Sequence, residues 1–358
     1  MGGRLRYIYI NIAIWIVGLT FIFSGFVKSV DPVGTSIFVE KYLATYGLES
    51  LITWALPMGV VLGAVELMLG LMLVAGAYRK VALMATTIFL VVFSVVTLLS
   101  ATILPIGDCG CFGDAVKLSP WQTFGKNVVL LPMTLGAWIL SRRDSSARHS
   151  MELTVVIALF ALILNLTSLR FQPLVDFLPY KVGVNLREEV ERAYDAEANA
   201  VIVYLQFRDK STGEIVDLPS NDLRCWSEEY DDYVDSYTAT QSADMSPFTD
   251  FRLYASDGDA TLQLLKREGR MIWITIFDAD ALQGSRLRAV RRIVEAYPND
   301  VVTITSADVN RVSSIVDVPC YAIDAMTLRS LIRSKVGVVV VDGGVIAGKW
   351  DVRDYERW

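Results

Sequence analysis

Two cysteines that stand one residue apart are the residues of this 358-residue chain best suited to chemistry. Cys109 and Cys111 are separated only by Gly110. Two thiols at this spacing can form a disulfide only across a sharp local turn, which a glycine permits. So small a ring strains the bond, and strained disulfides are easily reduced and are often catalytic or labile. The spacing therefore predicts that Cys109 and Cys111 cycle between dithiol and disulfide.

A structural role fits the same residues, because an oxidised Cys-Gly-Cys turn would hold its loop rigidly over neighbouring helices. Asp108 and Asp114 flank the pair, and negative neighbours raise the pKa of a thiol, which argues against an activated thiolate. We keep both interpretations open. A metal site is not predicted, because zinc would need two further nitrogen or sulfur ligands and the surrounding sequence offers none.

Glu66 is the second candidate, since it is a single acid within a long apolar run. An ionisable group inside a membrane span is a functional candidate by default, here as a proton relay or a contact to a quinone headgroup. The alternative, which we favour, is a protonated carboxyl bonded to a neighbouring span near Asn11, Thr86 or Thr87. Glycines that allow close helix contact recur around it: Gly59, Gly63 and Gly70. Lys28, at the end of another run, is expected to anchor at the membrane interface.

Five apolar runs must position these groups, and each approaches the length of about 20 residues that a helix needs to cross a bilayer. The runs cover residues 7–27, 51–77, 81–107, 121–141 and 153–169. The first follows two arginines, as in a signal peptide, but it is longer than a signal core and lacks a small-x-small cleavage site. We therefore predict that it is a retained membrane anchor.

Charge divides the chain into two parts. Residues 1–180 hold 12 Lys and Arg against 9 Asp and Glu, whereas residues 181–358 hold 21 against 30. With 53% apolar and 20% charged residues overall, this composition excludes disorder, a collagen-like repeat and a single soluble globule. It also excludes nucleic acid as an obvious partner, because no basic face is present to neutralise phosphates. The chain is predicted to join a membrane part to a soluble part.

The basic residues orient the five spans. If the N-terminus lies inside, the inner segments hold a consistent excess of positive side chains, as the positive-inside rule requires: Arg4, Arg6, Arg79, Lys80, Arg142, Arg143 and Arg148. The loop with Cys109 and Cys111 and all of residues 171–358 then lie outside, in a compartment that favours disulfides. We predict a multi-pass protein of the plasma (inner) membrane with a cytoplasmic N-terminus and an extracytoplasmic C-terminal domain.

The first outer loop carries its own helix signals. Asp31 followed by Pro32 is typical of a helix start, and Gly47 is typical of a helix end. We expect a short helix between them, which either lies on the outer interface or closes the end of the bundle.

The soluble part begins with a predicted helix at residues 186–198 and a strand hairpin at residues 200–207 and 214–218. From residue 271 strands and helices alternate, which predicts a parallel sheet, and residues 338–350 form a closing hairpin. This order resembles a thioredoxin-like domain over residues 271–358. Residues 251–258 are similar to the lead-in strand of the peroxidase-type relatives of that fold.

Two departures from the thioredoxin pattern bear on function. The Cys-x-x-Cys of that family would follow the first core strand, where residues 277–282 contain no cysteine, and Val336 replaces the proline that precedes the hairpin. We expect no thioredoxin chemistry, and a domain that binds a protein instead. Cys225 and Cys320 are either free thiols or a structural bridge.

Three motifs in residues 1–140 resemble the DoxX/MauE-like membrane family. They are Cys109-Gly-Cys-Phe-Gly before Leu118-Ser-Pro-Trp, Phe23-Ser-Gly-Phe-Val-Lys before Asp31-Pro, and the run around Glu66. The resemblance implies a four-helix membrane bundle. It also implies redox work, which is quinone-linked oxidation in one branch and disulfide formation during enzyme maturation in another. The residues of this chain to which the resemblance assigns a family position are Lys28, Glu66, Cys109 and Cys111.

The expected architecture is a membrane all-α four-helix transmembrane bundle (residues 1–150) with a fifth transmembrane helix (151–172). A linker and strand hairpin region (173–260) and an α/β thioredoxin-like extracytoplasmic domain (261–358) follow. The leading hypothesis is a membrane-bound redox accessory protein whose Cys109 and Cys111 exchange with a protein client and pass electrons to quinone, supported by Gly110, Glu66 and Lys28. The alternative is a non-enzymatic scaffold or assembly factor whose outer domain binds a protein partner. A transporter fits poorly, because the five spans show no internal repeat.

Overall fold

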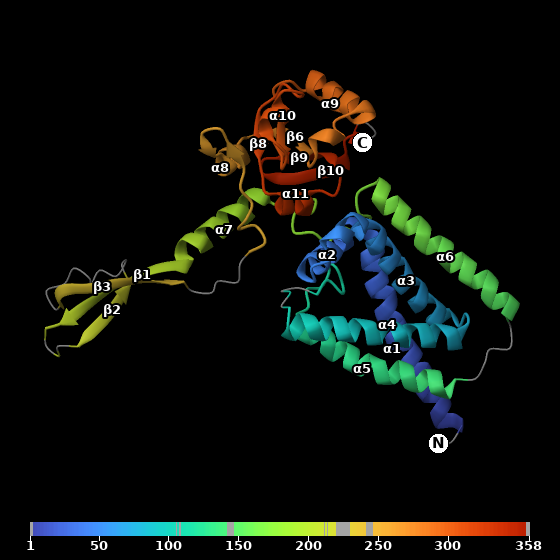
Figure 1. Cartoon of the computed structure of the whole chain (residues 1–358). Helices are drawn as coiled ribbons and strands as arrows, with labels where there is room; N and C mark the ends of the chain where they lie inside the picture. Colours follow the sequence, from blue (N-terminus) through green and yellow to red (C-terminus); the bar gives the residue numbers. More distant parts are fainter. Residues whose placement is uncertain are drawn as a thin grey trace. The chain divides into compact units, whose positions relative to one another are not determined.

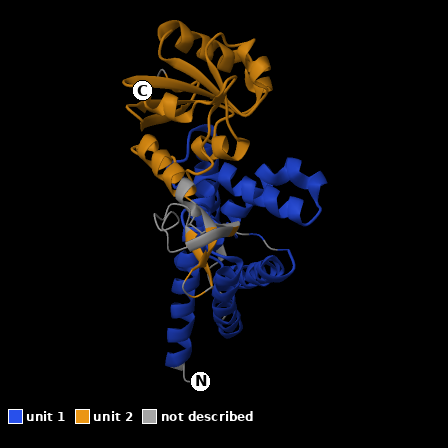
Figure 2. Ribbon diagram, turned by 90° about the vertical axis from the view of Figure 1, so that its left-hand side faces the viewer, with its two compact units in different colours: residues 1–178 blue, residues 179–358 orange. Residues whose placement is uncertain are grey.

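The computed structural model describes residues 3–355 except 105, 107–108, 142–146, 211, 213, 220–229 and 241–245. It divides into two compact units, residues 1–178 and residues 179–358, each with its own core (Figure 1, Figure 2). Asp108 and Cys225 therefore lie outside the described residues.

The first unit is helical. Its helices are α1 (Gly3–Val30), α2 (Pro32–Thr45), α3 (Ala55–Ala75), α4 (Arg79–Thr102), α5 (Pro120–Leu140) and α6 (Ala147–Arg170), with the 3-10 helix η1 (Glu49–Trp54) before α3. Among the described residues, five helices are long and apolar enough to cross a membrane, which confirms the five predicted spans. The chain is a multi-pass membrane protein. The third apolar run continues in sequence to residue 107, but α4 ends at Thr102, because Leu104 precedes a proline and that position disfavours helical backbone.

Glycines bring α1 and α3 into close contact. A Cβ atom on Gly25 would lie 2.1 Å from the backbone nitrogen of Leu67, and one on Gly70 would lie 2.5 Å from that of Ile22. Only hydrogen fits at these positions, so the two backbones pack as small-residue membrane interfaces do. The contact fixes which residues of α1 and α3 face each other. Large apolar side chains remain exposed on the bundle, as expected for a lipid-facing surface: Trp15, Val61, Ile88, Val129 and Ile163.

Helix α2 begins and ends as the sequence predicts. The Asp31 carboxylate accepts a hydrogen bond of 2.8 Å from the backbone N–H of Gly34, and Pro32 occupies the first helical position. Gly47 follows the helix with a φ of +70°. A Cβ on Gly59 of α3 would lie 3.1 Å from the backbone nitrogen of Ser36, so α2 packs closely against α3.

The second unit contains two sheets. Helix α7 (Leu186–Ala200) precedes a three-stranded antiparallel sheet of order β2-β1-β3, formed by β1 (Val201–Asp209), β2 (Ile215–Pro219) and β3 (Tyr230–Thr240). The predicted helix and hairpin are therefore confirmed.

The larger sheet has the order β10-β9-β6-β7-β8-β4-β5. Its strands are β4 (Tyr254–Ala255), β5 (Gly258–Asp259), β6 (Arg270–Ile276), β7 (Val301–Thr305), β8 (Cys320–Ala322), β9 (Val336–Asp342) and β10 (Val345–Asp351). Strands β6, β7 and β8 are parallel, while β9 pairs antiparallel with β6 and forms a hairpin with β10. The second unit is thus an α/β structure with the alternation that the sequence predicts.

Helices cover both faces of this sheet. Alternate residues of β6 enter different cores, Trp273 on one side and Ile274 on the other, as the two-residue period of a strand requires. Helices α7, α8 (Thr261–Leu265) and α11 (Ala325–Leu331) supply one core, and α9 (Gly284–Ala296) and α10 (Val309–Ser313) supply the other.

Candidate functional site

The cysteine pair lies on a tight turn between α4 and α5. Gly110 has a φ of +65°, a left-handed conformation that glycine adopts without strain. The N–H of Gly113 donates to the Gly110 carbonyl at 3.0 Å, and the N–H of Cys109 donates to the carbonyl of Leu118 at 3.3 Å. The turn brings Cys109 Sγ within 3.3 Å of Cys111 Sγ. The sharp turn that the sequence requires for a reaction between the two thiols is therefore present.

Both sulfurs belong to free thiols, so the structure shows the dithiol state of the pair. The two sulfur atoms of a disulfide are about 2.05 Å apart. Oxidation therefore requires Cys109 Sγ and Cys111 Sγ, now 3.3 Å apart, to approach each other by about 1.3 Å. Cys109 is 6% exposed, whereas Cys111 is only half-buried. The two residues therefore differ in overall exposure.

Helix α2 covers the pair from one side. The ring of Phe38 packs against Gly110, where an added Cβ would lie 2.5 Å from ring carbons. The hydroxyl of Tyr42 donates to Cys109 Sγ at 3.3 Å and lies 3.4 Å from the Cys109 carbonyl oxygen. Gly110 is thus required both for the turn and for the approach of α2.

The hydrogen bonds around Cys109 favour its thiolate. A hydrogen bond from the Cys111 thiol lowers the pKa of Cys109 to about 6, against the effect of burial, with further help from the Tyr42 hydroxyl and the positive charge of Lys126. The same hydrogen bond, together with burial, raises the pKa of Cys111. This lowering is opposite to the effect expected from flanking acids, and the groups that lower the pKa include the Cys111 thiol, the Tyr42 hydroxyl and Lys126.

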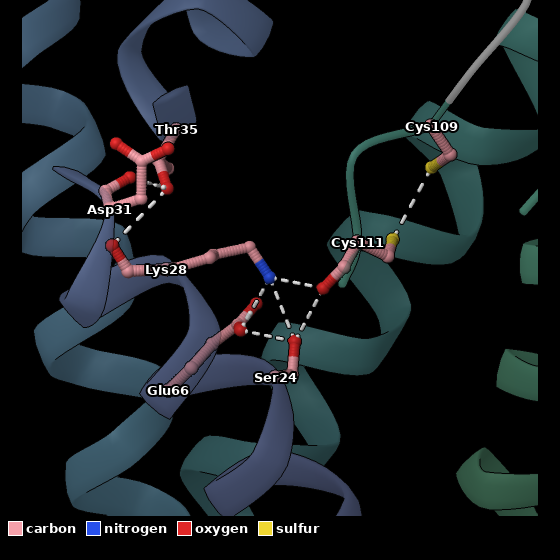
Figure 3. A network of polar contacts seen from close by, with 7 residues as sticks. All are labelled: Ser24, Lys28, Asp31, Thr35, Glu66, Cys109 and Cys111. Atoms are coloured by element: carbon pink, nitrogen blue, oxygen red, sulfur yellow. Dashed lines mark hydrogen bonds and ion pairs between the residues drawn. The ribbon is translucent and has the colours of Figure 1, made fainter. Parts of the chain in front are cut away.

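A buried ion pair lies directly beneath the turn (Figure 3). Lys28 of α1 and Glu66 of α3 are 3% and 5% exposed, and Lys28 Nζ lies 2.8 Å from Glu66 Oε2. Lys28 Nζ also donates to Ser24 Oγ at 2.8 Å and to the carbonyl oxygen of Cys111. The three hydrogens of the ammonium group thus have three acceptors. The Ser24 hydroxyl lies 2.6 Å from both Glu66 Oε2 and the Cys111 carbonyl oxygen.

This network corrects two expectations. Lys28 does not anchor at an interface, since its side chain is buried against Glu66. Glu66 is paired with Lys28 and Ser24, and two of the three partners that the sequence suggested are engaged elsewhere: the Asn11 amide donates to Tyr7, and the Thr87 hydroxyl donates to Leu83. The membrane ion pair instead holds the backbone of the cysteine turn.

The structure therefore joins Lys28, Glu66, Gly110, Cys109 and Cys111 into one site. Sequence reasoning missed three further residues. Ser24 precedes Lys28 by one helical turn on the same face of α1, which is a usable signal. Phe38 and Tyr42 occupy positions one turn apart on α2, but their contact with the cysteines depends on how α2 packs.

An apolar cavity of about 310 Å³ adjoins the pair. Phe38 and Tyr42 of α2, Leu62 of α3 and Val96 of α4 contribute to its walls, and the Cys109–Cys111 turn forms part of its lining. The volume is within the usual range of small-molecule pockets, about 300–1,000 Å³.

The second unit offers a different kind of site. Residues 277–282, where a thioredoxin would carry its cysteines, form a turn in which Asp278 caps the 3-10 helix η3 (Ala279–Ala281). A cavity of about 430 Å³ lies beside it, with Arg311 and Lys335 among its lining residues. Cys320 begins β8, and burial raises its pKa to about 11, which makes it a poor nucleophile at neutral pH. Among the described residues, no cluster of three or more His, Cys, Asp or Glu side chains is arranged to hold a metal ion.

Comparison with known proteins gives one family. Residues 6–140 match the family described as methylamine utilisation protein MauE, a span that includes α2 and the Lys28, Glu66 and Cys109–Cys111 positions. This match confirms the MauE resemblance for that segment. No curated protein and no solved structure matches the chain.

Proposed function

We propose that the protein is a membrane-bound redox accessory protein in which Cys109 and Cys111 exchange disulfides with a protein client and pass the electrons to quinone. The observation that carries this proposal is the pair of free thiols held 3.3 Å apart on a supported turn. The MauE match supports an accessory role in methylamine utilisation.

The reaction begins with the pair oxidised. A client thiolate attacks Cys111 Sγ, the Cys109–Cys111 bond breaks, and Cys109 leaves as a thiolate. The second client thiolate then attacks the client sulfur of the mixed disulfide and releases Cys111. The client gains a disulfide, and the pair gains two electrons and two protons. Quinone accepts these two electrons and two protons and becomes hydroquinone, which restores the disulfide of the pair.

Cys111 is assigned as the client-facing sulfur on two grounds. As a whole residue it is the more exposed of the two. The pKa of Cys109 is lowered to about 6, and the thiol with the lower pKa is the better leaving group in an exchange. Attack at Cys111 with departure of Cys109 satisfies both conditions.

The location belongs to the same proposal. We infer a plasma-membrane protein with its N-terminus in the cytoplasm and with the cysteine turn and residues 179–358 outside, supported by the basic residues of the inner segments. The order β10-β9-β6-β7, with β6 and β7 parallel and β9 antiparallel, supports a thioredoxin-like fold for the second unit. Without the usual cysteines this unit would bind the client, and the cavity beside Arg311 and Lys335 is a candidate contact.

Trapping of the mixed disulfide tests the exchange. In cells that express Cys109→Ser, the Cys111 thiolate can attack the disulfide of an oxidised client, which is the reverse of the exchange, and one client sulfur leaves as a thiolate. Because Cys109 is absent and cannot resolve the mixed disulfide, a client should remain bonded to Cys111 and shift the protein to higher mass on a non-reducing gel. Cys111→Ser should give much less of this species, and Cys320→Ser in the second unit should behave as the unchanged protein. If thiol labelling of native membranes shows a Cys109–Cys111 disulfide that is never reduced, the proposal fails.

The second candidate function is that of a non-enzymatic membrane scaffold or assembly factor. It is favoured by the absence of cysteine from residues 277–282 and by the Lys28–Glu66 pair, which would support a static turn equally well. Under this hypothesis deletion of residues 181–358 abolishes function, while Cys109→Ala combined with Cys111→Ala has little effect. Exchange activity predicts the opposite result for the cysteine variant.

A further inference from the structure

The apolar cavity of about 310 Å³ shares part of its wall with the reactive turn. Four helices contribute to its lining, α1 through Lys28 and α2, α3 and α4 through apolar residues. Phe38 and Tyr42 come from α2, Leu62 from α3 and Val96 from α4, and Cys109, Gly110 and Cys111 complete the lining. A molecule in this cavity would therefore be in direct reach of the Cys109 sulfur.

The chemistry of the walls restricts the occupant. Apolar and aromatic side chains dominate the lining, so a charged or strongly polar ligand would lose its hydration without compensation. The lining also has a few polar residues: Lys28, Thr35, Tyr42, Tyr46 and Thr97. The Tyr42 hydroxyl donates its hydrogen to Cys109 Sγ. The hydrogens of Lys28 are all engaged by Ser24, Glu66 and Cys111, so Lys28 does not offer a charge to a ligand. These walls fit a neutral, lipid-soluble molecule.

We propose that this cavity binds the ring of a membrane quinone beside the Cys109–Cys111 turn. The electron transfer in this inference rests on the proposed function, whereas the binding does not. When bound, quinone supplies a two-electron, two-proton acceptor. In the overall step the two S–H bonds of Cys109 and Cys111 break, one S–S bond forms, and both carbonyl oxygens of the ring become hydroxyls. The chain places the Cys109–Cys111 turn in the wall of the cavity.

The cavity also has a route for a lipid-soluble ligand to enter. Met58 of α3 and Val92 of α4 belong to its lining and are 42% and 52% exposed. Both residues lie on membrane-spanning helices, so their exposed surface faces the hydrocarbon, where quinones partition. The ring can enter from the membrane without crossing the polar turn.

Binding should be measured on the full chain in lipid nanodiscs, with decylubiquinone as the probe and intrinsic tryptophan fluorescence as the readout. The double variant Cys109→Ser, Cys111→Ser removes the redox reaction, so saturable binding by this variant is independent of electron transfer. Leu62→Trp fills the cavity and should weaken binding by about tenfold or more, which corresponds to about 1.4 kcal/mol. Val61→Trp is the matched control, because Val61 is the neighbouring residue of α3, 60% exposed, and does not line the cavity.

Each outcome decides between the two proposals. Loss of binding in Leu62→Trp but not in Val61→Trp supports the site, whether or not client exchange is ever found. Equal binding in both variants, or no saturable binding in the unchanged protein, overturns the site and leaves client exchange standing if the mixed disulfide forms. Should Leu62→Trp unfold, Val96→Phe with Val95→Phe as its control repeats the test from α4, since Val96 lines the cavity and Val95 is 54% exposed.

Discussion

Replacing Lys28 with methionine tests whether the membrane ion pair supports the cysteine turn. Methionine has a similar length but no charge, so the change leaves Glu66 buried, at 5% exposure, without its partner. It also removes the ammonium hydrogen bonds to Ser24 and to the Cys111 carbonyl. Breaking a buried ion pair from one side costs about 3–5 kcal/mol, so we expect a loss of that order in unfolding free energy.

The double variant Lys28→Met, Glu66→Leu separates two effects of losing Lys28. One is the cost of an unpaired buried charge, and the other is the loss of support for the cysteine turn. Because no charge remains buried, apolar replacement of the whole pair is expected to recover most of the lost stability. The Cys111 carbonyl, however, has still lost its Lys28 donor. We therefore expect the cysteine turn to stay altered in the double variant, with a rate of Cys109 alkylation that resembles the single variant.

Two measurements on the same samples check this prediction. Equilibrium unfolding in mixed micelles gives the free energies for the unchanged protein, Lys28→Met, Glu66→Leu and the double variant. Iodoacetamide reactivity of the reduced pair reports the turn. A cost below about 1 kcal/mol for Lys28→Met, typical of an exposed pair, would refute the assignment of a buried support. So would full recovery of both stability and thiol reactivity in the double variant.

Three further predictions concern the turn itself. The reduced protein should be alkylated with a pH midpoint of about 6, the pKa of Cys109, so its reactivity rises from pH 5 to pH 7; a midpoint near the ordinary thiol value of about 8.5 would contradict the hydrogen bond from Cys111. Tyr42→Phe removes a hydroxyl that stabilises the Cys109 thiolate and should move that midpoint upward, measured by the same titration. Gly110→Ala should destabilise the protein by about 1–3 kcal/mol, because alanine at a φ of +65° is strained and meets Phe38. Gly125→Ala, where nothing lies within 4 Å of the added carbon, should leave the melting temperature unchanged or slightly higher.

Patterns along the chain predicted the elements of this fold, because each depends on neighbours in sequence. The five spans follow from uninterrupted apolar runs, and helix α2 follows from Asp31 and Pro32. The turn at Gly110 follows from the spacing of the two cysteines. The alternation of strands and helices in residues 271–358 likewise predicted an α/β sheet with a closing hairpin.

Contacts between distant residues were not accessible in the same way. Lys28 and Glu66 are 38 residues apart, and their pairing depends on how α1 and α3 are aligned by Gly25 and Gly70. The contact of Tyr42 with Cys109 was not accessible for the same reason, because it depends on how α2 packs.

The support beneath the cysteine turn has a consequence for the order of biosynthesis. Ser24, Lys28 and Glu66 all precede Cys109 in the chain, and chains leave the ribosome from the N-terminus. The residues of α1 and α3 that support the turn are therefore synthesised before either thiol. Early pairing of these two helices would limit the time in which the cysteines could pair with the wrong thiol. A substitution at Gly25 or Gly70, which bring α1 and α3 together, would delay the formation of this support. The effect would be visible as incorrectly paired disulfides in newly made protein.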